Sequence, residues 1–156
     1  MKRNVITVLG AIAVLFSAGA VTASAQTAGG SVLEQVSYLL KDSYKFGLNS
    51  QGSCLTLRNS MTGVDGLVLE SNKGSVLFHI YLGNLSTLSA AKRERAEEKI
   101  TSMNTMLPIG TLVVAEDGDV LLTHHVGQGY VEATGIAKLV GNFVIEATRQ
   151  KSAIFG

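Results

Sequence analysis

Cysteine, proline and tryptophan are nearly absent from this sequence of 156 residues. Cys54 is the only cysteine, and the chain has one proline and no tryptophan. A single cysteine excludes a disulfide within the chain, so the fold must be held together by packing. Cys54 lies in the strand-like stretch SCLTL, which favours a small buried side chain over a reactive or intermolecular thiol.

The sequence also lacks the motifs of common catalytic sites. It contains no GxSxG nucleophile elbow, no P-loop, no GxGxxG and no HExxH. The stretch GQGY at 127–130 is better explained as the entry to a helix than as a phosphate-binding loop. We therefore predict no enzyme activity, no catalytic residues and no cofactor. The alternative hypothesis is a hydrolase whose active site is not recognisable from the sequence.

An excess of charge of one sign is missing as well. Lysine and arginine together number 13 against 12 aspartates and glutamates, which gives no electrostatic reason to expect nucleic acid as a partner. The run KRERAEEK at 92–99 mixes both signs and indicates the solvated face of a helix.

One long uncharged and mostly apolar run is present, at residues 5–21, shortly after Lys2 and Arg3. A small-residue cleavage site follows at residues 23–25, so residues 1–25 are predicted to be a signal peptide. An uncleaved membrane anchor is the alternative, because the run is near the lower length limit for a spanning helix. The prediction is an exported protein, periplasmic or secreted, without a membrane association after cleavage.

The chain that remains after the signal peptide is long enough for one domain with a hydrophobic core of modest size. We expect a flexible leader at 26–30, a single domain at 31–151 and a C-terminal tail at 152–156. Three helices are predicted from apolar residues at helical spacing, at about 32–44, 88–107 and 129–150. Ser31 with Glu34 forms a capping box before the first, Thr87 or Ser86 caps the second, and Pro108 ends it.

Strands are predicted at 53–58, 64–70 and 75–82, with the turn SNKG between the last two. Residues 110–126 should form a hairpin with a type I′ turn at Asp117-Gly118, because both central residues of that turn need positive φ. The expected fold class is α+β, an antiparallel sheet with helices packed on it, in the order α-β-β-β-α-β-β-α.

The stretch EDGDVLLTHH at 116–125 is dense in metal-ligand residue types. Its carboxylates fall on the hairpin turn, where acidic residues are ordinary. His124 and His125 are neighbours on a strand and should point to opposite faces of the sheet. They cannot hold one ion together, so no metal site is predicted.

Alternation along the strand at 75–82 separates two faces. Val76, Phe78, Ile80 and Leu82 form the core side, and Leu77, His79 and Tyr81 form an amphipathic second side. We predict that Leu77, His79 and Tyr81, joined by His125, are binding residues, since tyrosine and histidine among aliphatic side chains suit an interface. The alternative is that other segments of the chain cover this face.

Three stretches together resemble a YbjN-type domain. They are EEKITSMNTMLPIGTLVVAEDGDVLLTHHV at 97–126, IAKLVGNFVIEA at 136–147 and SVLFHIYL at 75–82. This bacterial family is described as sensory transduction regulators, and its fold is similar to that of type III secretion chaperones. In the family a helix ends near an asparagine, here Asn104, and a strand pair with an acidic-glycine turn follows. The resemblance spans about residues 32–150.

Three departures from the family pattern are visible. No tryptophan lies near Asn104, the segment 47–63 does not align, and many relatives lack an export signal. The resemblance implies a type III secretion chaperone-like fold and a non-enzymatic protein-binding or regulatory module. Its partner would be a protein or peptide, with a homodimer as one arrangement. The alternative is a periplasmic protein that binds a small ligand or a metal with its histidines.

Overall fold

A computed structural model describes residues 30–59, 64–127 and 129–156 of the chain. The expected signal peptide at 1–25, and the leader as far as residue 29, lie outside the described residues. Within the described ranges, no helix is both long and apolar enough to cross a membrane.

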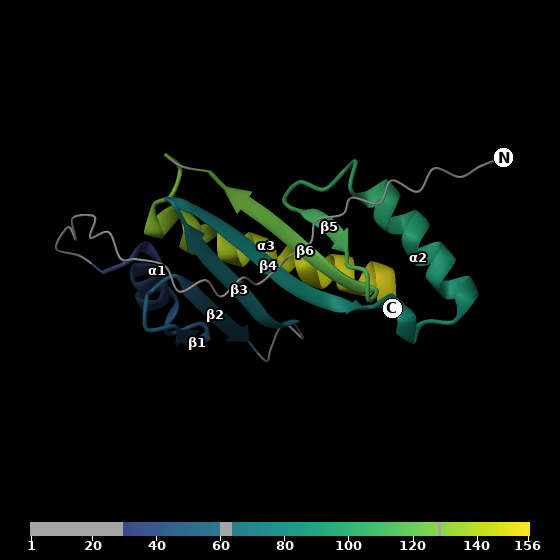
Figure 1. Cartoon of the computed structure of the whole chain (residues 1–156), viewed down its shortest axis with the longest axis horizontal. Coiled ribbons are helices and arrows are strands. Elements are labelled where there is room, and N and C mark those ends of the chain that lie inside the picture. The colour runs from purple at the N-terminus through teal and green to yellow at the C-terminus, as the bar shows by residue number, and fades with distance from the viewer. Residues whose placement is uncertain (1–29, 60–63, 128) are drawn as a thin grey trace.

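The domain is built on one antiparallel sheet of six strands (Figure 1), which confirms the predicted α+β class. The strand order across the sheet is β1-β2-β3-β4-β6-β5. The strands are β1 (Lys45–Leu48), β2 (Cys54–Asn59), β3 (Val64–Asn72), β4 (Ser75–Asn84), β5 (Thr111–Val114) and β6 (Asp119–Val126). The helices are α1 (Val32–Leu40), α2 (Ala90–Met103), α3 (Ala133–Phe155) and the short 3-10 helix η1 (Leu85–Thr87).

Strand β1 is not predicted by the sequence pattern. Its four residues, KFGL, show no alternation of buried and exposed side chains, and a turn-rich segment follows them. The strand exists because its backbone pairs with β2, with Phe46 opposite Leu57. Tertiary pairing therefore supplies what the local pattern does not indicate.

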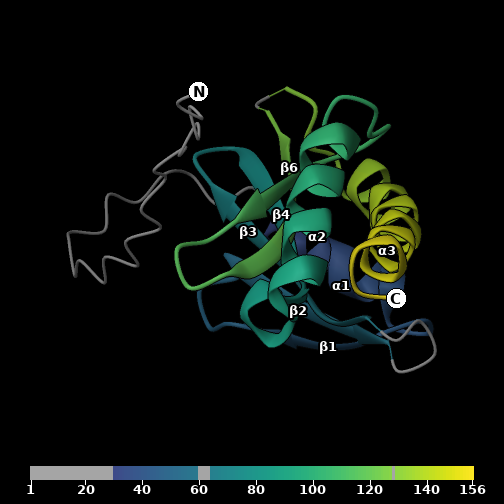
Figure 2. The same cartoon turned by 90° about the vertical axis from the view of Figure 1, so that its right-hand side faces the viewer.

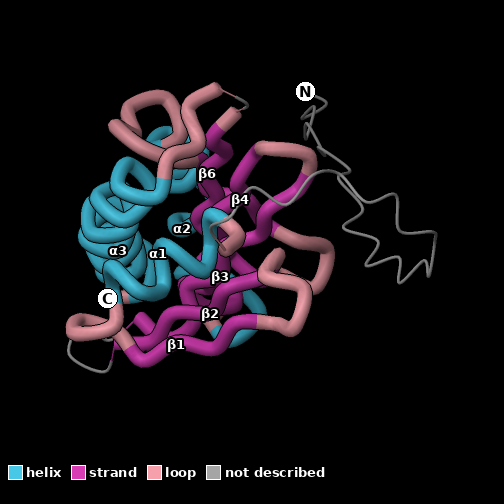
Figure 3. Tube along the Cα trace, turned by 90° about the vertical axis from the view of Figure 1, so that its left-hand side faces the viewer, coloured by secondary structure: helices cyan, strands magenta, loops and turns pink. Residues whose placement is uncertain are grey.

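Helices α1 and α3 cover one face of the sheet, and no described helix covers the other (Figures 2 and 3). The covered face carries the apolar core, because alternate residues of each strand point toward α3. The largest fully buried side chains include Phe78 and Phe143, whose rings meet edge to face with centroids 5.5 Å apart. Other core residues of the sheet are Leu55, Leu57, Leu67, Leu69, Val76, Ile80, Leu82, Leu112, Val120 and Leu122.

The helix boundaries differ from the predicted ones. Helix α1 begins as expected, with the Ser31 hydroxyl accepting the N–H of Glu34 at 3.2 Å, but it ends at Leu40. The N-cap residue of α2 is Ser89, without a side-chain capping bond, and not the predicted Thr87 or Ser86. The helix already ends at Met103, so the prediction that Pro108 ends it is wrong. Helix α3 continues past Gln150 to Phe155, so the expected tail contains the last turn of the helix. Ile154 is buried there, and tertiary packing extends the helix beyond its periodic stripe.

The two predicted hairpins are present, but the turn types differ from expectation. Gly118 has a positive φ of 88°, whereas Lys73 is the one non-glycine residue with positive φ in the described ranges. The type I′ prediction at Asp117-Gly118 is therefore wrong. The Gly118 N–H donates to the Ala115 carbonyl at 3.0 Å, which makes a three-residue loop ending in a left-handed glycine.

The Asp117 carboxylate makes a local hydrogen bond within this turn. It accepts the N–H of Asp119 at 3.1 Å, the bond typical of an Asx turn. The consecutive positive φ values of a type I′ turn occur instead in the other hairpin, at Lys73 (48°) and Gly74 (78°).

Candidate functional site

The uncovered face of the sheet, called the open face below, brings together the four residues predicted to bind. Leu77 on β4 lies opposite His125 on β6, and His79 lies opposite Thr123 in the next row. Tyr81 lies opposite Leu121 in the third row. The strand register thus places all four predicted residues on one surface, and His125 is the histidine that joins His79.

The rows continue onto the neighbouring strands. Val68 of β3 pairs with His79, and Glu70 pairs with Leu77. On the other side, Val113 of β5 pairs with Leu121. The middle of the open face, on β4 and β6, therefore carries aliphatic, aromatic, threonine and histidine side chains, and Glu70 lies at its margin. Tyr81 is 45% exposed and Val113 is 38% exposed.

The phenol of Tyr81 lies near the acidic turn. Burial raises the pKa of the Tyr81 hydroxyl, and the carboxylates of Asp119 and Asp117, with a hydrogen bond to Asp119, raise it further. The phenol is accordingly neutral near pH 7 and is able to donate a hydrogen bond.

The acidic turn itself has a structural role. The Asn84 Nδ2 donates to the Asp119 Oδ1 at 2.7 Å and to the Asp117 carbonyl at 3.1 Å. Gly118 accepts the N–H of Leu85 at 2.8 Å through its carbonyl. The turn is thus tied to η1 at the end of β4.

His124 lies on the opposite side of the sheet from His125. It pairs with Phe78 across the strands, and its ring centroid is 6.1 Å from that of Phe78 and 6.4 Å from that of Phe143. Burial lowers the pKa of the His124 imidazole, and the charge of His125 lowers it further. His124 is therefore part of the packing between β6 and α3.

The three histidines do not form a metal centre. His79 and His125 share the open face, while His124 faces the core. Across the described ranges, no three side chains of histidine, cysteine, aspartate or glutamate come close enough together to hold a metal ion.

Cys54 is half-buried, opposite Glu70 on the open-face side of β2. Burial raises the pKa of its thiol, and the Glu70 carboxylate adds to the effect. Since the thiolate is the nucleophilic form, this environment works against a reactive cysteine.

Asn104 is a residue whose role could not be assigned from the sequence. It follows the last residue of α2, and its side-chain Nδ2 donates to the Leu112 carbonyl at 2.8 Å. Its Oδ1 accepts the Leu112 N–H at 2.7 Å. One amide side chain therefore pairs with both backbone groups of a residue in the edge strand β5. The resemblance to the family marks an asparagine near the end of this helix, but the helix predicted from periodicity ran on to residue 107, so the bond to the strand was not foreseen.

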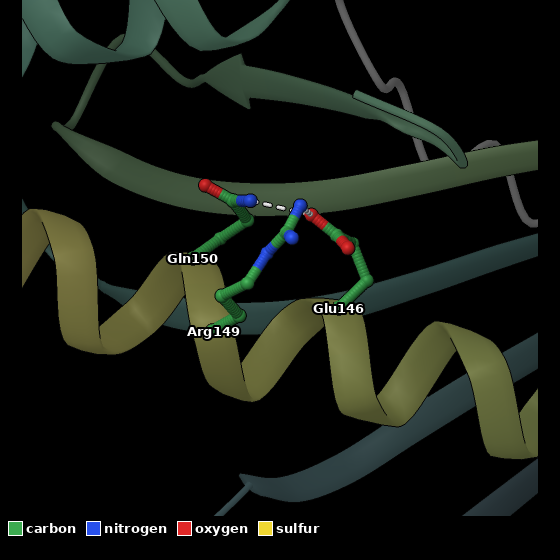
Figure 4. A network of polar contacts seen from close by, with 3 residues as sticks. All are labelled: Glu146, Arg149 and Gln150. Atoms are coloured by element: carbon green, nitrogen blue, oxygen red, sulfur yellow. Dashed lines mark hydrogen bonds and ion pairs between the residues drawn. The ribbon is translucent and has the colours of Figure 1, made fainter. Parts of the chain in front are cut away.

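Beside this contact, a pocket of about 270 Å³ lies between α2 and α3. Its walls are the apolar side chains of Met103, Met106 and Leu107 and residues of α3. The nearby polar group on α3 is shown in Figure 4, where Arg149 and Gln150 both reach Glu146. Gln150 is 3% exposed, and its Oε1 has no hydrogen-bond partner.

Of three comparisons with known proteins, the one with solved structures identifies the fold. No model of a protein family matches this sequence. A search of curated proteins found no match either. Among solved structures, YbjN from E. coli matches with a TM-score of 0.55 and 12% identity, over 76% of this chain and 86% of YbjN.

Two structures from type III secretion also match. One is a chain of the heterodimeric ExoU–SpcU complex of Pseudomonas aeruginosa, with a TM-score of 0.56 and 15% identity, over 78% of this chain and 96% of that one. The other is the Yersinia pestis chaperone SycH in complex with a stable fragment of YscM2, with a TM-score of 0.49, 16% identity, and coverage of 76% and 96%. The YbjN-like, type III secretion chaperone-like fold expected from the sequence is confirmed.

Proposed function

We propose that this protein is a non-enzymatic module that binds a polypeptide partner on the open face of its sheet. The observation that carries the proposal is the middle of that face, where Leu77, Tyr81 and Leu121 lie among threonine and histidine side chains. Interface centres are depleted in charged residues and enriched in tyrosine. The partner surface that fits is apolar and weakly charged, with a donor for the Tyr81 hydroxyl oxygen, because the O–H itself is directed to Asp119.

Two further observations support this proposal. The fold is shared with a chain of ExoU–SpcU, which is a heterodimeric complex. The raised pKa of the Cys54 thiol disfavours the thiolate, which supports a role without nucleophilic catalysis. The residues assigned to binding are Leu77, His79, Tyr81 and His125.

We also propose that the protein is exported, because residues 1–25 have the composition of a signal peptide. The partner would then be a periplasmic or secreted polypeptide. A ligand- or metal-binding role for the three histidines is not favoured, since His124 faces away from the other two.

The test is to replace His79 and Tyr81 together with serine and to compare capture of proteins from a bacterial envelope extract. The matched control is Ile145→Ser, because Ile145 is 69% exposed and lies on α3, away from the open face. We expect the wild type and the control to enrich the same proteins, and the double variant to lose them.

A double variant that folds, by circular dichroism, and still enriches the same proteins would refute the open face as the binding surface. A second copy of the chain is the other occupant to consider. Sedimentation velocity of the purified protein distinguishes it, because a homodimer through this face would dissociate in the double variant.

A further inference from the structure

Strand β5 forms one edge of the sheet, and this edge is protected by its short length and by the segment after α2 rather than by its own side chains. Its four residues, TLVV, include no charge and no proline, and no shift in register with β6 is present. Val113 and Val114 are 38% and 42% exposed. Natural edges are protected by charged side chains, proline or bulges, and the opposite edge strand β1 carries Lys45. Once the segment after α2 moves away, such an edge is a template for pairing with another strand.

Asn104 makes the bonds that a neighbouring strand would make. Its amide donates to the Leu112 carbonyl at 2.8 Å and accepts the Leu112 N–H at 2.7 Å. In an antiparallel ladder, a hydrogen-bonded pair of residues exchanges the same two bonds. Asn104 therefore occupies the place of one residue of an added strand. The alternation of the ladder directs the N–H and C=O of Val114 toward the same edge.

The end of α2 that carries Asn104 is lightly attached to the rest of the domain. Of the 14 residues of α2, Ala96 and Ile100 are the fully buried ones, and beyond them Met103, Leu107 and Ile109 pack against the core only in part. Lys99 adds one polar attachment, with its Nζ donating to the Ala153 carbonyl at 2.8 Å. The pocket of about 270 Å³ lies beneath the last turn and the following loop. Segments with few buried apolar contacts open at low free energy, so this end is able to move away from β5.

We propose that the outer edge of β5 is a docking site for one extended segment of a partner polypeptide, and that Asn104 is the gate that closes it. The arriving strand replaces the two bonds of Asn104 to Leu112 and continues the ladder to Val114. Main-chain hydrogen bonds provide the affinity in this mode of recognition, and the exposed Val113 and Val114, which lie on opposite faces of the strand, favour an apolar segment. The inference rests on the proposed function in assuming a polypeptide partner, but it uses a different surface.

The experiment compares the wild type with Asn104→Ala and Asn104→Asp. The probe is a fluorescein-labelled peptide containing Thr-Leu-Val-Val flanked by lysines, and its binding is followed by fluorescence anisotropy. We expect Asn104→Ala to bind about tenfold or more tightly than the wild type, because two hydrogen bonds no longer need to be broken first. Asn104→Asp retains the acceptor for the Leu112 N–H and should fall between the two.

The matched control is Thr105→Ala, since the Thr105 hydroxyl donates only locally, to the Ser102 carbonyl at 2.7 Å. It should bind the peptide as the wild type does. Amide hydrogen exchange gives the location, and the bound peptide should slow the exchange of the Val114 N–H.

A folded Asn104→Ala protein that binds no tighter than the wild type would overturn the gate. A Val114 N–H whose exchange is unchanged by saturating peptide would overturn the docking site. If Asn104→Ala does not fold, the same two measurements on Asn104→Asp decide the matter. The His79 and Tyr81 double variant should still bind the peptide, so failure of the open face and failure of the β5 edge give different results.

Discussion

His124 and His125 show how one step along a strand separates two environments. Their neighbouring positions on β6 put His125 on the open face opposite Leu77, and His124 on the core side opposite Phe78. The alternation was predictable from the sequence. The contact of His124 with Phe143 was not, since it requires α3 to lie across this strand.

The stability of the protein should fall in acid because of His124. The folded state lowers the pKa of this imidazole below its ordinary value of about 6.5. The folded protein therefore binds fewer protons than the unfolded chain, and the stabilisation present above pH 6.5 is lost as the pH falls below it. Urea unfolding at about pH 7.5 and about pH 5.0 measures this loss.

In His124→Leu we expect a smaller change in the urea midpoint between the two pH values. His125→Gln should reduce the change in part, because the charge of His125 contributes to the lowered pKa of His124. An equally large change in His124→Leu would assign the acid sensitivity to other groups.

The buried pair of Glu146 and Gln150 should be a net cost to stability. Gln150 donates to Glu146 but leaves its own Oε1 without a partner. Replacing both partners of a buried polar pair with apolar groups of similar shape is often neutral or stabilising. We expect the Glu146→Leu, Gln150→Met double variant to raise the free energy of unfolding by about 1 kcal/mol in a urea titration. A loss of that size would show that the pair stabilises the fold as it stands.

At the scale of elements, the last turn of α3 is held against β4. A Cβ built on Gly83 would lie 2.8 Å from two ring atoms of Phe155, so the ring packs directly over this glycine. The periodic stripe of α3 predicted its course to Gln150. Its last turn depends on this contact with β4, which the sequence of the helix does not contain.

Gly83→Ala should therefore displace the end of α3 and lower the free energy of unfolding by about 1 kcal/mol, the lower end of the cost of overpacking. The check is a double-mutant cycle with Phe155→Ala. Once the ring is removed, the alanine at 83 should have almost no further effect. Additive losses would mean that Gly83 matters for a reason other than the ring.

At the scale of the whole molecule, the predicted export can be tested directly. Expressed in a bacterium, the protein should appear in the periplasmic fraction or the medium, and its N-terminal sequence should begin at Gln26. An intact Met1 on protein recovered from the membrane fraction would instead indicate an uncleaved anchor.

The sequence by itself determined the features that depend on local pattern. Alternating side chains on β4 predicted which face is core, and the same alternation placed Leu77, His79 and Tyr81 together on the other face. The three helices, the two hairpins and the α+β class followed from periodicity and from turn residues, because these signals lie within a few neighbouring positions.

Tertiary structure decided what depends on contacts between distant residues. The register of β4 with β6 places His125, and not His124, beside Leu77 and His79 on the open face. Pairing with β2 made a strand of residues 45–48, and the bonds of Asn84 tied the acidic turn to the end of β4. The bonds of Asn104 to Leu112 exist because the end of α2 lies against the edge of the sheet. The position of that helix end depends on the packing of the whole domain and not on a local sequence pattern.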